Sequence, residues 1–185
     1  IDMLMGMGKR SLAFVWRPND IKSALIDMFR RTHSRAICDL TAEDLDEAAA
    51  TLIRADIDGD VVEVKVSISQ VVSEGLSSFL TETGVKVLWV ELNPYSLDKS
   101  LTEVFESISA LPEEYSCHLV TGDLGVIREI LNRYPQGAHI ALKGSEASGF
   151  VSTENMLPLL AAVRKMAADC SVGLSLSIWG GIGTA

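Results

Sequence analysis

The sequence predicts an α/β protein of the (β/α)8 TIM-barrel type, and two features of the 185-residue chain indicate it. Short apolar runs rich in β-branched residues alternate with amphipathic helical patterns almost without interruption. Glycine-bearing turns follow the last two of these runs, at residues 144–149 and 180–183. An open dinucleotide-binding sheet would carry its phosphate turn after the first strand, where Arg17, Pro18 and Asn19 offer no glycine.

About seven strands are predicted, because seven runs are apolar on both faces, as parallel strands covered on both sides must be. They span residues 11–17, 35–40, 61–66, 85–92, 117–121, 139–143 and 173–178. Strands that alternate with helices through short connections pair in parallel through right-handed crossovers. The order of the chain therefore predicts a parallel sheet with helices packed against it.

Six helices are predicted between the strands, and their ends carry recognisable signals. Asn19 and Asp20 open the first helix, which runs through about residue 33, and Thr41 opens the second. The apolar stripe of the second helix consists of Leu45, Ala48, Ala49, Leu52 and Ile53. The later helices are predicted over residues 69–83, 97–111, 124–134 and 154–169.

Residues 1–185 are predicted to form one barrel domain that is incomplete at its C-terminal end. A complete barrel usually takes about 250 residues, and the last strand–helix unit is missing from the pattern. An exposed parallel edge would invite association. We therefore expect the missing unit to come from a longer polypeptide or from another chain, with a homo-oligomer as one such arrangement.

The composition excludes several classes of partner. A net charge of −9 with a sequence pI near 4.8 argues against nucleic acid, whose phosphates need a basic surface. No run of about 18 uncharged apolar residues is present, so we expect no membrane span and a cytoplasmic protein. Cys38, Cys117 and Cys170 are expected to be buried thiols. The three histidines share no ligand spacing, so no metal site is predicted.

The glycine turns are the first candidate for a binding site. Gly144 and Gly149 bracket one segment whose backbone can approach a ligand closely, and Gly180, Gly181 and Gly183 form a second. On the carboxyl face of a barrel, their N–H groups could cradle a phosphate, which makes flavin mononucleotide (FMN) the first hypothesis. Glycine turns after strands also occur without ligands, so this observation leaves both interpretations open.

Residues 143–152 (KGSEASGFVS), the following TENMLPLL and the final IWGGIGTA resemble a known family. It is the group of nitronate monooxygenases and FMN-dependent enoyl reductases, which are (β/α)8 barrels with a G-x-E-x-G-G-H-x-G turn and a GGI turn. The sequence is more similar still to nitronate-monooxygenase-like domains of large bacterial type I polyketide or polyunsaturated fatty acid synthases. The resemblance is specific in the last third of the chain and topological before it.

The resemblance implies a set of site residues. Gly144, Glu146 and Gly149 match the first turn, and the second turn is matched by Gly180, Gly181, Ile182 and Gly183. These residues and Lys143 are the implied cofactor-binding residues, with FMN as the cofactor. Glu146 and Lys143 are the catalytic candidates, with an acyl or other small molecule as substrate and the other domains of a multidomain synthase as partners. A solvated charge at the strand end is the alternative for Lys143.

Some residues depart from the family pattern. Phe150 stands where the family has the His that serves as base in nitronate oxidation, and Ser148 and Ser152 stand where glycines are expected. The first strand ends in Trp16 and Arg17 rather than in a Gly-Gly-Met turn. These departures favour an alternative function: a non-catalytic structural or docking domain of a megasynthase that has lost flavin chemistry.

Charged residues at other strand ends supply a further hypothesis. Asp39 ends the second strand, Glu91 ends the fourth, and Lys65 closes the third as their natural counter-ion. Such a cluster is either catalytic or a charge network that closes the barrel top. A flavin-free phosphosugar lyase or isomerase could use Lys65 and Glu91. The tryptophans at positions 16, 89 and 179 lie on strands and are expected to pack in the core.

Overall fold

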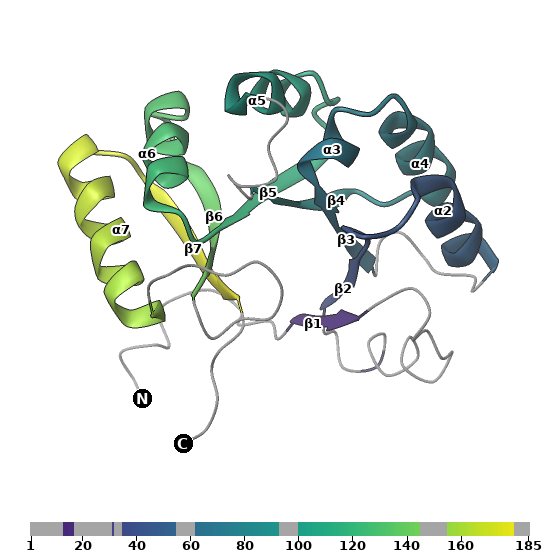
Figure 1. Cartoon of the computed structure of the whole chain (residues 1–185), viewed down its shortest axis with the longest axis horizontal. Helices are drawn as coiled ribbons and strands as arrows, with labels where there is room; N and C mark the ends of the chain where they lie inside the picture. The colour runs from purple at the N-terminus through teal and green to yellow at the C-terminus, as the bar shows by residue number, and fades with distance from the viewer. Residues whose placement is uncertain are drawn as a thin grey trace. The chain divides into compact units, whose positions relative to one another are not determined.

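The computed structural model describes residues 13–16, 31, 35–54, 62–92, 100–144 and 155–179 (Figure 1). The sheet is seven-stranded, with the strand order β1-β2-β3-β4-β5-β6-β7. Neighbours in the sheet are also neighbours in the chain, which is the connectivity of a (β/α) barrel. The predicted class, an incomplete (β/α)8 barrel, is therefore confirmed.

The chain divides into two compact units. Unit 1 consists of residues 1–65 and 74–87, and unit 2 consists of residues 66–73 and 88–185. The prediction of one barrel domain over residues 1–185 stays a prediction.

Unit 1 contains the first strands and two of the helices. β1 (Ala13–Trp16) pairs in parallel with β2 (Arg35–Asp39), and β2 pairs in parallel with β3 (Val62–Ser67), of which residues 62–65 belong to unit 1. Two helices, α2 (Leu45–Arg54) and α4 (Gly75–Thr83), pack against each other through apolar faces (Figure 1). Leu52 of α2 and Phe79 of α4 are almost fully buried, so this contact forms part of the core of the unit.

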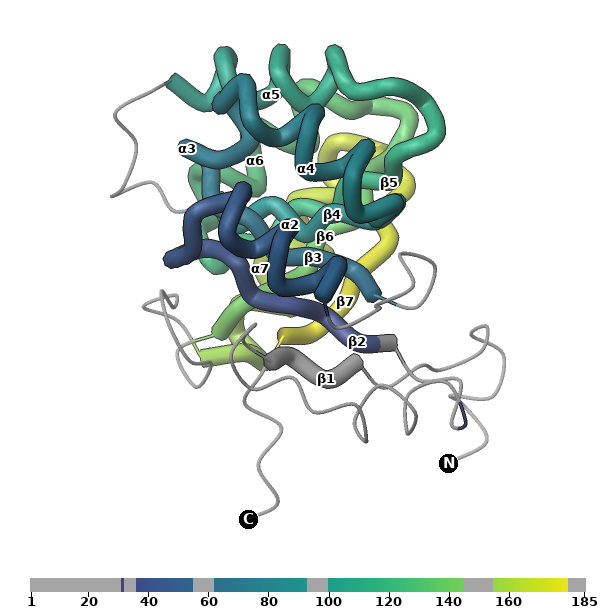
Figure 2. The backbone as a smooth tube through the Cα atoms, turned by 90° about the vertical axis from the view of Figure 1, so that its right-hand side faces the viewer, coloured from purple at the N-terminus to yellow at the C-terminus, as the bar shows by residue number. Residues whose placement is uncertain are grey.

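Unit 2 contains the later strands and helices. Its strands are β4 (Val87–Glu91), β5 (Ser116–Thr121), β6 (Ala138–Lys143) and β7 (Leu174–Trp179). Its helices are α3 (Ile68–Val71), α5 (Leu101–Ser109), α6 (Leu124–Arg133) and α7 (Met156–Cys170). β5, β6 and β7 pair in parallel, α6 packs against α7 (Figure 1), and α3 contacts α5 (Figure 2).

One predicted helix is wrong in its continuity. Residues 69–83 were expected to form one helix, but the helix is interrupted between α3 and α4. The Ser67 hydroxyl accepts a hydrogen bond from the Gln70 N–H, and the Gln70 side chain accepts one from the Ser67 N–H. The Ser73 hydroxyl then donates to the Gln70 carbonyl oxygen at 2.7 Å. Serine side chains compete in this way for backbone groups that a continuous helix would use.

The strands of unit 2 have two different faces, because side chains alternate along a strand. Leu88 and Val90 of β4 and Ile140 and Leu142 of β6 are fully buried apolar residues on one face. The other face carries polar and aromatic side chains instead: Trp89, Glu91, His118, His139, Lys143 and Trp179. We call this second face of unit 2 the polar face.

Candidate active site at the carboxyl ends of the strands

A buried ion pair lies at the carboxyl end of unit 2. The Nζ atom of Lys143, the last residue of β6, donates to Oε1 of Glu91, the last residue of β4, at 2.7 Å. Lys143 is 1% exposed. A buried ammonium needs a close partner of opposite charge, since desolvation without one costs several kcal/mol. The pair thus fixes an amine and a carboxylate at the edge where barrel enzymes carry their active sites.

The ion pair changes the interpretation of both Lys143 and Glu91. Lys143 is not a solvated charge, which was one of the alternatives for it. Glu91 does lie at the end of its strand, as expected, but its ion pair is with Lys143. The sequence did not indicate this pair, because 51 residues separate the two and their contact depends on how the strands are placed in space.

A second ion pair ends the strands of unit 1. Lys65 Nζ donates to Asp39 Oδ2 at 3.0 Å, and Lys65 is 4% exposed. Asp39 Oδ1 also accepts from the N–H and the hydroxyl of Thr41. Burial raises the pKa of Asp39, but the Thr41 hydrogen bonds and the charge of Lys65 outweigh it, so this pKa lies below its ordinary value. The expected pairing of Lys65 with Asp39 is therefore present.

The glycine turns follow adjacent strands. β6 and β7 are parallel, and Lys143 stands opposite Trp179 in the register. Gly144, directly after Lys143, is buried. The segments that continue from Lys143 and Trp179 therefore start side by side at one edge of unit 2. The other turn residues lie outside the described residues: Glu146, Ser148, Gly149, Phe150, Ser152, Gly180, Gly181, Ile182 and Gly183.

Aromatic rings gather on the polar face around Trp89. Its ring centroid lies 4.6 Å from that of His118, 5.8 Å from that of His139 and 5.2 Å from that of Trp179. Trp89 is 4% exposed, which confirms the expectation of core packing for this residue. His118 and His139 share no recognisable spacing in the sequence, but the sheet places their rings next to each other. The available signal was their similar position near the start of consecutive strands.

The cysteines differ from one another in burial. Cys38 is fully buried and Cys117 is partly buried, but Cys170 is exposed at the end of α7, so the expectation of a buried thiol is wrong there. Burial raises the pKa of the Cys117 thiol to about 11, and that of Cys38 is also raised above its ordinary value by burial. A thiol with a raised pKa is a poor nucleophile near neutral pH. Neither Cys38 nor Cys117 is therefore a candidate catalytic residue.

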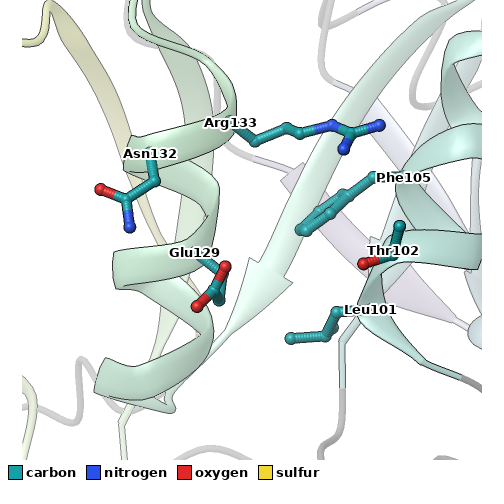
Figure 3. Close-up of a pocket in the computed structure, with 6 residues that line it drawn as sticks. All are labelled: Leu101, Thr102, Phe105, Glu129, Asn132 and Arg133. Carbon is teal, nitrogen blue, oxygen red and sulfur yellow. The ribbon is translucent and has the colours of Figure 1, made fainter.

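A groove of about 190 Å³ lies between two helices of unit 2 (Figure 3). Leu101, Thr102 and Phe105 of α5 face Glu129, Asn132 and Arg133 of α6 across it. None of these residues is a site residue predicted from the sequence. The groove lies on the helices, whereas the ion pairs and the glycine turns are at strand ends.

The described residues contain neither a metal-binding cluster nor a membrane-spanning helix. In residues 35–54, 62–92, 100–144 and 155–179, no three or more His, Cys, Asp or Glu side chains are grouped closely enough to hold a metal ion. No helix within these ranges has the length and apolar character needed to cross a membrane.

Comparisons with known proteins identify the fold. No known family profile matches the chain, and no curated protein sequence matches it. Among solved structures, N-acetylneuraminate lyase from Fusobacterium nucleatum, complexed with pyruvate, matches with 14% identity and a TM-score of 0.53, over 85% of this chain and 48% of the lyase chain. A variant of muconate cycloisomerase matches with 12% identity and a TM-score of 0.54, over 96% of this chain and 49% of the other.

A muconate lactonizing enzyme from Klebsiella pneumoniae matches with 15% identity and a TM-score of 0.51, over 89% of this chain and 44% of the enzyme chain. The chain thus spans less than half the length of each of these structures. Identities this low show the fold alone. All three are TIM-barrel enzymes and none is a nitronate monooxygenase, so the chain has a TIM-barrel fold, and its family stays a proposal.

Proposed function

We propose that this chain is part of an FMN-dependent oxidoreductase of the nitronate monooxygenase and enoyl reductase type, in a polyketide or fatty acid synthase system. The observation that carries the proposal is the register of β6 and β7, in which Lys143 stands opposite Trp179. Because the strands are parallel, the two glycine-bearing segments begin next to each other at one edge. Adjacent glycine turns at the carboxyl ends of barrel strands suit a phosphate-bearing ligand.

The described residues next to these turns fit an anionic cofactor. Gly144 is buried and has no side chain to occupy the space beside the strand end. Lys143 supplies a cationic donor at the same point, and Glu91 holds its amine in place. In the proposed site, backbone N–H groups of residues 180–183 would hold the phosphate of FMN, and Lys143 would contact the flavin or the substrate.

FMN would supply the redox chemistry by accepting or delivering a hydride. The protein's own part is to bind, to orient and to manage protons. Lys143 can donate a hydrogen bond to a carbonyl or nitronate oxygen and so stabilise negative charge that develops on it. The 2.7 Å hydrogen bond from Lys143 Nζ to Glu91 Oε1 fixes the position of the Lys143 ammonium group. Glu146 remains the other catalytic candidate from the sequence.

A second candidate function is a non-catalytic barrel domain of a megasynthase. Phe150 in place of the catalytic His favours it, as do Ser148 and Ser152 in place of glycines. The mutual neutralisation of Lys143 and Glu91 is also what a purely structural ion pair would show. The flavin-free lyase or isomerase stays a hypothesis, and its two proposed residues, Lys65 and Glu91, each have an ion pair with a different residue.

The test is the uptake of FMN by the protein in the longest form that its gene encodes. We expect the purified protein to be yellow, or to bind added FMN with quenching of flavin fluorescence, and Gly181→Asp to abolish binding. Gly173→Asp is the matched control, since a side chain at Gly173 meets nothing within 4 Å. A colourless protein that takes up no added FMN would sink the proposal and favour the non-catalytic domain.

A further inference from the structure

The groove between α5 and α6 has an apolar side and a charged side (Figure 3). Leu101 and Phe105 lie on the α5 side, and Glu129 and Arg133 lie on the α6 side. Phe105 is 3% exposed, and its ring packs edge-on against that of Tyr134, with the centroids 5.8 Å apart and the planes at 87°. This contact fixes the Phe105 ring as the floor of the groove.

Glu129 and Arg133 are one helical turn apart on α6, so their side chains start on the same side of the helix. A glutamate four residues before a basic residue stabilises a helix when the two side chains pair. Within the part of the chain that the structure describes, neither side chain has an ion pair or a hydrogen bond. Arg133 extends instead from α6 toward α5 (Figure 3). A cation and an anion can therefore both meet a ligand in the groove.

The size and the lining of the groove limit the ligand to a small zwitterion. A cavity of about 150 Å³ holds a molecule as large as benzene, and this groove has about 190 Å³. A ligand with one negative and one positive end can contact Arg133 and Glu129 together, because the Cβ atoms of residues four apart on a helix are about 5–6 Å apart. A free amino acid has both charged groups, and an apolar side chain on it can contact Leu101.

We propose that the groove between α5 and α6 binds a free amino acid with an apolar side chain. The Arg133 guanidinium donates parallel hydrogen bonds to the carboxylate of the ligand, and the Glu129 carboxylate accepts from its ammonium group. Both charged side chains are exposed, so water and salt weaken each pair and we expect a dissociation constant of about one millimolar. This site does not depend on FMN binding, so it can hold even where the proposed function fails.

The experiment titrates the protein, in the longest form that its gene encodes, with L-leucine and follows binding by saturation-transfer NMR of the ligand. We expect saturable binding. Leucinamide lacks the carboxylate and N-acetyl-leucine lacks the ammonium group, so each should bind at least about threefold more weakly than leucine. Glycine has both charged groups but no apolar side chain, and it should also bind more weakly than leucine.

Variants assign each charged group of the ligand to its partner. Arg133→Gln should weaken leucine binding at least about threefold but leave leucinamide binding unchanged, and Glu129→Gln should weaken leucine binding but not that of N-acetyl-leucine. Arg128→Gln, on an exposed residue of α6 that does not line the groove, is the matched control and should leave leucine binding unchanged. No saturable binding at tens of millimolar leucine, or leucine binding that Arg133→Gln leaves unchanged, would overturn the proposal.

Discussion

Lys143 and Glu91 form the residue-scale centre of the candidate site. Each is the last residue of its strand, and the two side chains are 2% and 10% exposed. A carboxylate in such a position is tolerated because an ammonium lies 2.7 Å away. The pair explains how a lysine that is 1% exposed is tolerated at the end of a strand.

Removal of one partner should therefore destabilise the protein. Lys143→Met leaves Glu91 buried without its counter-ion, and we expect a loss of about 3–5 kcal/mol in the free energy of unfolding. The double variant Lys143→Met with Glu91→Gln should be more stable than the single variant, because neither charge of this pair remains. Urea unfolding measures both, with Lys165→Met as the exposed control. Equal losses in the single and double variants would show that the pair is not coupled.

Asp39 gives the protein a pH dependence of stability. Its pKa in the folded state lies below the ordinary value of 3.8. As the pH falls, Asp39 therefore takes up its proton at a higher pH in the unfolded state than in the folded state. The stability that Asp39 contributes is complete above about pH 4 and is lost as the pH falls through the pKa of Asp39 in the folded state. Asp39→Asn should reduce the decline in unfolding free energy between about pH 5 and pH 3. If the free energy of unfolding of Asp39→Asn falls with pH as steeply as that of the parent protein, Asp39 does not cause this pH dependence.

At the residue scale, the sequence predicts an ion pair correctly where the two residues lie on consecutive strands. Lys65 closes the strand after Asp39, so their pairing followed from the strand order alone. Lys143 and Glu91 lie on β6 and β4, and β5 separates these strands in the sheet order. Their contact reaches across an intervening strand, which the order of strands along the chain does not indicate.

At the element scale, two helices of unit 2, α5 and α6, start at well-formed caps. The Ser100 hydroxyl accepts from the Glu103 N–H, and the Glu103 carboxylate accepts from the Ser100 N–H at 2.9 Å. Asp123 caps α6 in a similar way through the Val126 N–H. These caps explain why residues 124–134 could be predicted as a helix to within about a residue, whereas the helix over 69–83 could not be predicted as two pieces.

The α5 cap should contribute measurably to stability. Ser100→Ala removes the acceptor for the Glu103 N–H, and we expect a loss of about 1 kcal/mol in the free energy of unfolding. Ser107→Ala, in the same helix and away from its start, is the matched control and should have a smaller effect. Chemical denaturation of both variants distinguishes the cap from a general effect of removing a hydroxyl. A Ser107→Ala loss as large as that of Ser100→Ala would contradict the capping role.

At the scale of the whole molecule, the described strands are buried unequally. β3 is almost entirely buried, whereas every residue of β7 is partly or fully exposed. Ile178 of β7 is 44% exposed. An apolar edge strand of this kind is a surface on which another strand can add.

Self-association of the 185-residue chain should therefore depend on β7. Ile178→Lys should lower the average mass measured by light scattering at high protein concentration, because a charge on an edge strand opposes pairing. Ile53→Lys is the control, since Ile53 is 53% exposed on α2 of unit 1. An equal decrease in both variants, or no association in the parent protein, would contradict a role for this edge.

The site itself was predicted only in part, and the reason is physical. Glycine turns report where a backbone can approach a ligand closely, and the register of β6 and β7 shows that two such segments start together. The identity of the ligand depends on side chains and on N–H directions around the turns, which a motif does not specify. Phe150 illustrates this limit, because an aromatic residue at that position suits both a flavin site and a plain core.

The most direct test of the central claim is a crystal structure of the protein, in the longest form that its gene encodes, after soaking with FMN. We predict density for the FMN phosphate against the backbone of residues 180–183, with the Lys143 amine on the side of the flavin ring or of the substrate space. If crystals soaked with saturating FMN show no FMN density at the ends of β6 and β7, or show FMN bound elsewhere, the account is contradicted.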